Sequence, residues 1–191
     1  MEEKLRVVVA DDEPITRLDL IEMLENEGCE VAGEASDGFD TIELCRSVHP
    51  DLVLMDVKMP LLDGISAATV IREERLADAV ILLTAYSDAE FVERARNCGV
   101  SVYLIKPVDV RTLVPNIEMA VARGREQRQL EEEVKAANRK LEERKLIERA
   151  KGFLMESEGM KEQEAFDYIR RISREKSIAM KKVAELILFK R

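Results

Sequence analysis

The chain has 191 residues, of which 46% are hydrophobic and 36% charged, enough for one sizeable core and a small second module. Residues 1–122 carry 25 acidic and 11 basic side chains, which suits a domain that binds a metal cation, whereas residues 145–191 carry 8 and 12, a mildly basic balance that permits nucleic acid without requiring it. The only histidine, His49, precedes a proline in a predicted loop, so a histidine-based triad and a zinc site are excluded. The three cysteines form no Cys-x-x-Cys pair, which disfavours redox chemistry.

Nothing in the sequence indicates secretion or a membrane. The segment Met1–Lys4 is charged and lacks an apolar secretory core, and no apolar run approaches 18 residues. The widely spaced thiols fit small buried hydrophobes in a reducing compartment, so we expect a cytoplasmic protein. The thiols are Cys29, Cys45 and Cys98.

Short apolar runs alternate with amphipathic stretches as far as about residue 122. The runs predict strands, and stretches with apolar residues three and four positions apart, such as Leu18, Ile21 and Leu24, predict helices. This alternation is typical of a parallel sheet with helices on both faces, so the expected fold class is α/β, doubly wound. The expected strands are 5–10, 30–35, 52–56, 79–84 and 102–105, and the expected helices are 14–27, 38–48, 64–75 and 88–98.

Polar side chains stand at the carboxyl ends of four of these strands. Carboxylates at the edge of a core are costly to desolvate unless they are paired or bind a metal. Because crossover connections are right-handed, ligand groups should gather at the carboxyl ends of the strands. We therefore expect a single site. It comprises Asp11, Asp12, Asp56, Thr84 and Lys106.

These residue types fit the transfer of a phosphoryl group to an aspartate. The Asp56 carboxylate can attack a phosphoryl group and hold it as an acyl phosphate. Mg²⁺ prefers hard oxygen ligands, which two or three carboxylates on adjacent strands supply. Lys106 would contact one phosphoryl oxygen as a point charge, and Thr84 would donate a hydrogen bond to another. Plainer roles stay open, because Asp11 can merely cap the helix near Pro14.

After the fifth strand, a helical pattern begins and scarcely stops until Gly159. Thr112 can cap this helix, which leaves Pro115 in the first turn, where a missing N–H costs little. Asp109 can cap it instead, and Pro115 would then bend it. Gly124 weakens the helix without having to break it.

A short apolar seam marks the middle of this helix. Its apolar residues step by four, three and four, but the next position is Arg144, so the repeat lasts only about two heptads. Residues 123–145 are therefore either a short coiled coil or a charged connector packed on its own domains. The seam positions are Leu130, Val134, Ala137 and Leu141.

The end of the chain is predicted to form three short helices. Gly159 ends the first, the second is expected over 161–175, and Ser177 can cap the third. A module of this size is near the limit at which a core is stable alone. The expected domains are residues 1–122, a helical linker at 123–145, and an all-α domain at 146–191.

Four segments in the front part of the chain form a joint pattern whose order and spacing are highly specific. They are Asp11-Asp12-Glu13-Pro14, then Leu54-Met55-Asp56-Val57-Lys58-Met59-Pro60 with Asp63-Gly64, then Thr84-Ala85, and last Tyr103-Leu104-Ile105-Lys106-Pro107.

With this pattern, residues 1–122 resemble the receiver domain of bacterial two-component response regulators. The resemblance implies the strand order 2-1-3-4-5 and a phosphoryl donor that is a sensor histidine kinase. It implies that Asp12, Asp56 and the Lys58 carbonyl bind Mg²⁺ directly, while Asp11 acts largely through water. It also implies that Thr84 and Tyr103 form a switch pair, and that the Lys106–Pro107 bond is cis. Such a protein is a phosphoacceptor and not an enzyme, with at most weak autophosphorylation and autodephosphorylation.

A second set of motifs lies in the C-terminal helices. It reads IERAKGFLM over 147–155, EA over 164–165, IRRIS over 169–173 and VAELI over 183–187. These segments resemble the ANTAR module, an RNA-binding three-helix domain of transcription antitermination regulators, a group that includes regulators of ethanolamine utilisation. Where that family often has a capping Ser or Thr, this chain has Lys161. The resemblance implies binding to paired hairpins in a nascent transcript leader, which stops the adjoining terminator from forming.

RNA binding of this kind needs cations that face phosphates and a few groups that reach bases. Gly152 would allow close approach of a backbone or of a packed helix. At helical spacing, Phe153, Phe166 and Tyr168 are expected to be core residues rather than stacking platforms. The expected RNA-binding cations are Lys151, Arg170, Arg174, Lys176, Lys181 and Lys182.

Phosphorylation of Asp56 is expected to draw Thr84 and Tyr103 inward and to reshape the surface near residues 86–110. That surface, aided by the 123–145 helix, would favour a homodimer. Two other classes stay open: a DNA-binding regulator, although the tail shows no recognition-helix pattern, and an adaptor whose tail helices dock a partner protein. A phosphatase of related fold is disfavoured because a further acid/base group is missing.

Overall fold

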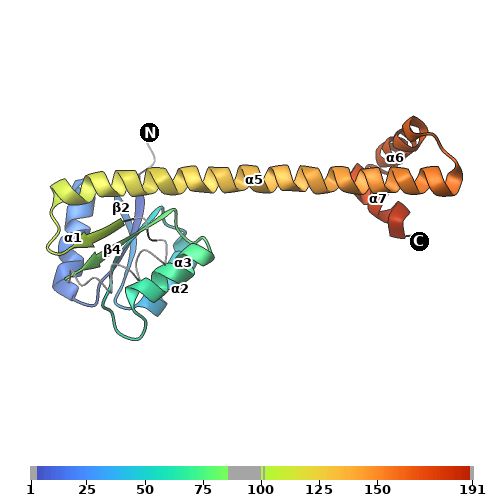
Figure 1. The fold of residues 1–191 in the computed structure, drawn as a ribbon. Helices are drawn as coiled ribbons and strands as arrows, with labels where there is room; N and C mark the ends of the chain where they lie inside the picture. Colours follow the sequence, from blue (N-terminus) through green and yellow to red (C-terminus); the bar gives the residue numbers. More distant parts are fainter. Residues whose placement is uncertain (1–3, 86–99, 101, 190–191) are drawn as a thin grey trace. The chain divides into compact units, whose positions relative to one another are not determined.

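The computed structural model describes residues 4–85, 100 and 102–189 (Figure 1). They belong to two compact units, Met1–Arg128 and Gln129–Arg191. The helix expected over 88–98 lies outside the described residues.

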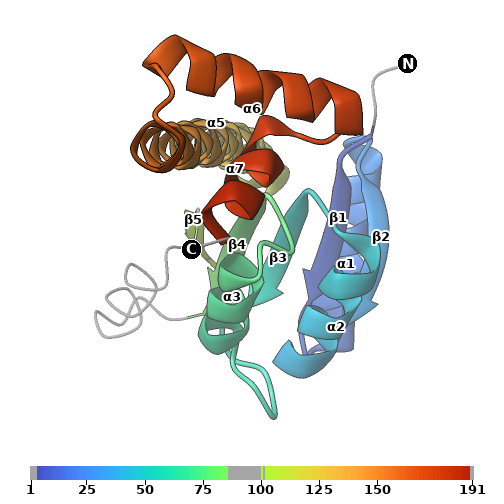
Figure 2. The ribbon, with the colours of Figure 1, turned by 90° about the vertical axis from the view of Figure 1, so that its right-hand side faces the viewer.

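The first unit contains a five-stranded parallel sheet with the order β2-β1-β3-β4-β5, as the resemblance implied. Every residue of β3 is buried, which explains its uninterrupted apolar run, since both faces of a parallel sheet are covered. In Figure 2 the arrowheads of β1, β2 and β3 lie at the same end of the sheet. The strands are β1 (Arg6–Ala10), β2 (Glu30–Ala35), β3 (Leu52–Asp56), β4 (Ala79–Thr84) and β5 (Val102–Ile105).

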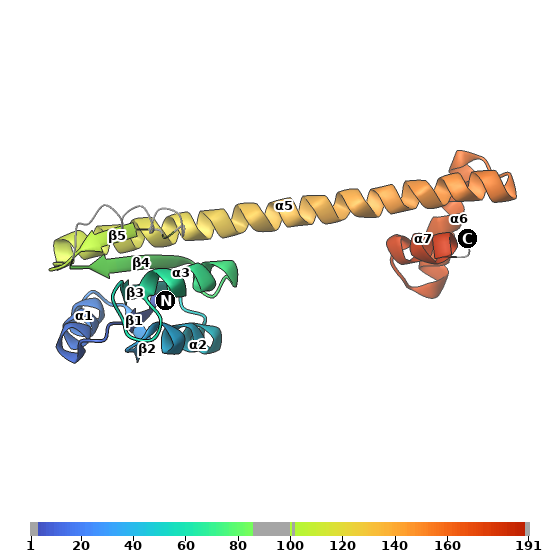
Figure 3. The ribbon, with the colours of Figure 1, turned by 60° about the horizontal axis from the view of Figure 1, so that its bottom comes forward.

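Helices cover both faces of this sheet. Side chains of α2 (Gly38–Val48) and α3 (Gly64–Glu73) join one buried cluster with alternate strand residues. Side chains of α1 (Pro14–Asn26) and of the first turns of α5 (Val110–Glu158) join the other cluster. Figure 3 shows the first turns of α5 running alongside β4 and β5. The alternation of Val7 and Val9 with Val8 and Ala10 between the two clusters is the two-residue period of a strand.

Helix α5 begins as one of the two alternatives predicted. Asp109 is the cap, because its Oδ1 accepts a hydrogen bond of 2.8 Å from the Thr112 N–H. Pro115 lies inside the helix, which continues to Glu158 and is ended by Gly159 with a left-handed φ of +68°.

Gly124 holds α5 close to the sheet, which the sequence did not indicate. A Cβ there would lie 2.0 Å from the Asp78 carbonyl oxygen, so only glycine allows this approach. Arg125 pairs with Asp51 at 2.8 Å, and Arg128 pairs with Asp78. The first unit therefore includes contacts beyond residue 122, the end expected for it.

The second unit packs the last turns of α5 against α6 (Glu162–Lys176) and α7 (Met180–Phe189). The expectation that Ser177 caps the third helix is wrong. Ser177 has a left-handed φ of 52° and its N–H donates to the Arg174 and Ser173 carbonyls, so it ends α6 instead. The buried core is Ala150, Leu154, Ala165, Ile169, Val183 and Ala184.

Candidate functional site

The centre of the site is one ammonium group between two buried carboxylates. Lys106 Nζ lies 2.6 Å from Asp11 Oδ2 and 2.7 Å from Asp56 Oδ1. Asp11 is 1% exposed and Asp56 6% exposed. The three residues come from the ends of β1, β3 and β5. Asp11, Asp56 and Lys106 therefore lie together, as the sequence predicted.

Strand register brings the two carboxylates together. β1 and β3 pair with Ala10 opposite Met55, so the residues that follow, Asp11 and Asp56, lie beside each other. Asp56 is the last residue of β3, and Asp11 comes directly after β1. Backbone donors then fix both groups: Asp11 Oδ1 accepts from the Glu13 N–H at 3.0 Å, and Asp56 Oδ2 accepts from the Lys58 N–H at 2.9 Å.

The charges of this cluster affect each other's protonation. Burial raises the pKa of Asp56, and the Asp11 carboxylate adds to this, although Lys106 and the Lys58 N–H act in the opposite direction. Burial would lower the pKa of Lys106, but its hydrogen bonds to Asp11 and Asp56 outweigh burial and raise it. The lysine therefore stays charged while it holds both carboxylates.

Gly64 keeps the end of β3 in place. Its N–H donates to the Val57 carbonyl at 2.9 Å, and a Cβ on Gly64 would lie 2.1 Å from the Asp56 carbonyl oxygen. Asp63 caps α3 through its Oδ1, which accepts from the Ser66 N–H at 2.8 Å. The Asp63-Gly64 pair thus seats α3 directly against the backbone of Asp56.

The proposed switch residues lie on the neighbouring strands. Thr84 is buried at the end of β4, and its carbonyl accepts from the Lys106 N–H at 2.7 Å. Tyr103 on β5 is partly buried against the cluster that α2 and α3 share. The Lys106–Pro107 peptide bond is cis, as the resemblance implied. The inward shift of Thr84 and Tyr103 stays a prediction.

The donor set fits Mg²⁺ in part. Asp11 and Asp56 supply hard carboxylate oxygens that converge on one cation, and Mg²⁺ commonly takes few protein ligands and keeps several waters. Asp12, expected as a direct ligand, has an exposed side chain. Across the ranges that the structure describes, no three His, Cys, Asp or Glu side chains are grouped closely enough to hold a metal. That Asp12 and the Lys58 carbonyl bind Mg²⁺ stays a prediction.

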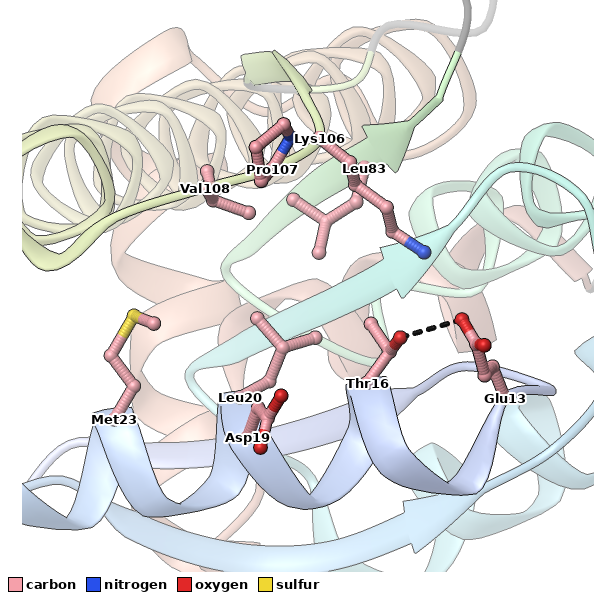
Figure 4. A pocket seen from close by; sticks show the side chains of 9 residues that line it. All are labelled: Glu13, Thr16, Asp19, Leu20, Met23, Leu83, Lys106, Pro107 and Val108. Atoms are coloured by element: carbon pink, nitrogen blue, oxygen red, sulfur yellow. Dashed lines mark hydrogen bonds between the residues drawn. The ribbon is translucent and has the colours of Figure 1, made fainter.

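A groove of about 440 Å³ opens beside Lys106, between α1 and the segment that joins β5 to α5 (Figure 4). Its floor is apolar and its α1 rim carries Glu13, whose Oε2 accepts from the Thr16 hydroxyl at 2.7 Å. The sequence pattern did not indicate this groove, although Leu20 and Met23 stand one helical turn apart on α1. The lining residues are Glu13, Thr16, Asp19, Leu20, Met23, Leu83, Lys106, Pro107 and Val108.

Most of the expected RNA-binding cations lie on the outer surface of the second unit. Arg174 and Lys176 are exposed near the end of α6. Arg170 is exposed and pairs with Asp167 at 3.3 Å, and exposed Lys182 pairs with Glu185 at 3.1 Å. Lys181 is half-buried.

Lys151 does not share this environment. Its side chain is buried, and its Nζ lies 2.9 Å from Glu148 Oε2 and 2.8 Å from Glu162 Oε1. Its pKa is raised first by Glu162 and then by Glu148. The ammonium connects α5 to α6 and is not presented to solvent as a phosphate-facing cation would be. The expected RNA contact of Lys151 therefore has no support from its position.

Gly152 stands on the same helix with open space around it. A Cβ added there would meet nothing within 4 Å, so packing inside this unit does not require glycine. Among the expected core aromatics, Tyr168 packs against the buried cluster, and Arg171 lies 5.4 Å above its ring.

Of the helices that the structure describes, none combines the length and the hydropathy needed to cross a membrane.

Comparison with known families gives two matches. Residues 7–118 match the response regulator receiver domain, and residues 135–188 match the ANTAR domain.

Among curated proteins, the chain is 49% identical over 183 residues to the transcriptional regulatory protein PdtaR of Mycobacterium tuberculosis, covering 96% of this chain and 89% of that protein. It is 35% identical over 125 residues to the probable transcriptional regulatory protein NarL of the same species, covering 65% of this chain and 57% of that protein. The first similarity spans both units, whereas the second is limited to about two thirds of the chain.

Solved structures resemble the first unit. The signal receiver domain of the putative response regulator NarL from Mycobacterium tuberculosis aligns with a TM-score of 0.60 and 32% identity, over 63% of this chain and 98% of that one. A CheY-like receiver domain protein from Methanospirillum hungatei aligns with a TM-score of 0.61 over 65% and 99%; its 24% identity supports the fold alone.

Proposed function

Because the chain belongs to the response regulators that join a receiver domain to an ANTAR domain, we propose that phosphorylation of Asp56 by a sensor histidine kinase controls RNA binding by the second unit. The observation that carries this proposal is the Lys106 ammonium between Asp11 and Asp56 at the carboxyl ends of the strands. A buried carboxylate held beside a fixed cation is the arrangement that an aspartyl phosphate needs.

In the proposed transfer, an Asp56 oxygen attacks phosphorus as the bond from phosphorus to the donor nitrogen breaks, which leaves an acyl phosphate. Lys106 then pairs with a phosphoryl oxygen, and the Lys58 N–H holds the aspartyl group in orientation. A bound Mg²⁺ would screen the negative charge of the incoming group. The groove beside Lys106 is the surface that we assign to the phosphodonor, because it opens next to this ammonium.

The proposed output is antitermination. The second unit would bind paired hairpins in a transcript leader and prevent the adjoining terminator from forming. Exposed Arg170, Arg174, Lys176 and Lys182 supply cations for phosphates. Phosphorylation would favour a homodimer, and the second hairpin contact would then benefit from effective concentration.

The phosphorylation step can be tested by incubating the full chain with acetyl phosphate and Mg²⁺ and measuring its intact mass. We expect the mass gain of one phosphoryl group in the wild type and in Asp40→Asn, which changes an exposed carboxyl on α2. We expect none in Asp56→Asn. Equal phosphorylation of Asp56→Asn would show that another residue is the acceptor.

The RNA step needs a comparison of ligands. We expect salt-dependent filter binding of a twin-hairpin leader RNA, tighter after treatment with the phosphodonor, and much weaker binding of the equivalent duplex DNA. Preference for the duplex would favour a DNA-binding regulator. No salt-dependent binding of either ligand would favour an adaptor that docks a protein.

A further inference from the structure

The exposed segment of α5 in the second unit carries an apolar stripe along one side. The stripe consists of Leu130, Val134, Ala137 and Leu141, which we call the seam. Leu130 is 56% exposed, Val134 58% and Leu141 50%. Within the part of the chain that the structure describes, the seam is therefore not covered. These exposures argue against the alternative of a connector packed on its own domains.

Charges beside the seam are segregated along the helix. Residues 131–133 are three glutamates, whereas the bases Lys135, Arg139 and Lys140 follow them along the helix. The hydrogen bond of 3.0 Å between Gln129 and Glu133 lies within the helix and leaves the carboxylate at the surface. The part of the exposed segment before Val134 is thus acidic, and the part after it is basic.

A second helix can lie along the seam either parallel or antiparallel to the first. The segregated charges distinguish these two orientations. With Leu130 and Ala137 at heptad position d and Val134 and Leu141 at a, the flanking g positions are Glu126, Glu133 and Lys140, and the flanking e positions are Glu131, Asn138 and Lys145.

In a parallel pair, each g residue faces the e residue five positions later on the other helix. Lys140 would then face Lys145 of the second copy, and Glu126 would face Glu131 of the second copy. By symmetry each like-charged contact occurs twice, and like charges at such positions destabilise the pair. Nothing in this register compensates them, because Glu133 would face the neutral Asn138.

In an antiparallel pair, g residues face g residues. When Leu130 faces Leu141 of the second copy and Val134 faces Ala137, Glu133 lies opposite Lys140 of the second copy, twice by symmetry. The seam is covered along its whole length, and the acidic half of each helix lies against the basic half of the other.

We propose that the seam binds a second copy of this chain with the two helices antiparallel, held in register by Glu133 and Lys140. The inference rests on the homodimer of the proposed function and adds its orientation. An antiparallel pair separates the two C-terminal bundles. Residue 146 of one copy lies level with residue 125 of the other, so the two bundles begin about 30 Å apart along the axis, at 1.5 Å per residue. The RNA sites of the dimer therefore lie at opposite ends of the paired helices.

The two orientations respond to one substitution with opposite sign. In the antiparallel dimer, Lys140→Glu places a carboxylate opposite Glu133 of the second copy and should raise the dimer dissociation constant about tenfold at low salt. In a parallel dimer the same change relieves the contact with Lys145 and lowers the constant. Glu133→Lys should weaken the antiparallel dimer similarly, and Glu133→Lys combined with Lys140→Glu should restore it. The matched control is Lys135→Glu, the same charge change at position b, away from the seam.

The measurement is sedimentation equilibrium of the full chain after treatment with beryllofluoride and Mg²⁺, at low salt and at 1 M salt, where the effect of Lys140→Glu should disappear because charges are screened. Helix content from circular dichroism checks that each variant stays folded.

Tighter association of Lys140→Glu, or failure of the double variant to recover, overturns the proposal. So does an unchanged constant for both Lys140→Glu and Val134→Asp, since the seam would then not be the interface. RNA binding that responds to the phosphodonor in these variants would leave the proposed function intact, whereas its absence in the wild type refutes that function separately.

Discussion

Lys106 is a single positive charge shared by two buried carboxylates. The pair of Asp11 and Asp56 therefore retains an excess negative charge in a place where water is scarce. Burial is the first cause that raises the pKa of Asp56, and the charge of the Asp11 carboxylate adds to it. A site with this imbalance gains from any additional cation, which is the physical reason to expect Mg²⁺ there.

The raised pKa of Asp56 leads to a prediction about pH. Because the folded-state pKa of Asp56 is raised, the native state binds this proton more tightly than the unfolded chain, so stability falls as pH rises from about 3.9 through the folded-state value. Asp56→Asn removes this loss. In Mg²⁺-free buffer we expect the variant to melt at a higher temperature than the wild type at pH 7, with the advantage shrinking toward pH 4.

Thermal unfolding at several pH values measures this difference, and Asp40→Asn is the control for an exposed carboxyl. A constant difference between Asp56→Asn and the wild type across that range would mean that the ionisation of Asp56 is not its cause.

Helix α5 has three different surroundings along its length. Near its start, Leu113 and Ile117 are buried against the sheet; in the middle, the seam is exposed; near its end, Ala150 and Leu154 are buried against α6 and α7. Its two glycines reflect these surroundings, because Gly124 lies against the Asp78 backbone and Gly152 faces open space.

These glycines form a matched pair for substitution by alanine. Gly124→Ala places a Cβ against a backbone oxygen, so we expect about 1–3 kcal/mol of destabilisation. Gly152→Ala meets nothing and should stabilise the helix by up to about 1 kcal/mol. Urea unfolding measures both. If Gly152→Ala is stable yet loses affinity for RNA, Gly152 lies at a contact with the ligand; comparable destabilisation by both variants would contradict the open space at Gly152.

The contact between α5 and α6 depends on Lys151 as well as on apolar packing. Lys151→Met removes both ion pairs and should cost no more than about 1 kcal/mol, because Glu148 and Glu162 are largely exposed. We expect faster amide hydrogen exchange in α6 and a smaller loss of RNA affinity than in Arg174→Met, where an exposed cation is lost. A large loss of RNA affinity in Lys151→Met without faster exchange would return Lys151 to the RNA contacts.

The division of the chain into two compact units predicts two separate unfolding events. Leu54 is buried in the sheet and Leu154 in the small C-terminal core, and truncation of a buried leucine to alanine costs about 2–5 kcal/mol. By calorimetry at pH 7 we expect Leu54→Ala to lower one transition and Leu154→Ala the other. A joint shift of both transitions in either variant would show that the units unfold cooperatively.

The amino-acid sequence was sufficient to predict the α/β class, the bounds of the sheet strands and of the described helices α1 to α3 within one or two residues, and the meeting of Asp11, Asp56 and Lys106. These follow from short-range periodicity and from the rule that parallel strands end on one edge, both of which are local information. The receiver and ANTAR motifs are local as well, and the family comparisons confirm both resemblances.

Other features depended on which surfaces pack together. From the sequence, Lys151 was expected to be a cation available to RNA, and only the position of α6 brings Glu162 to it. Serine is a common residue at the start of a helix, but the left-handed backbone of Ser177 ends the preceding helix. Gly124 and the groove beside Lys106 likewise arise from contacts between segments far apart in the chain. Tertiary packing decided them, because burial and the identity of an ionic partner are properties of the folded surface and not of any sequence window.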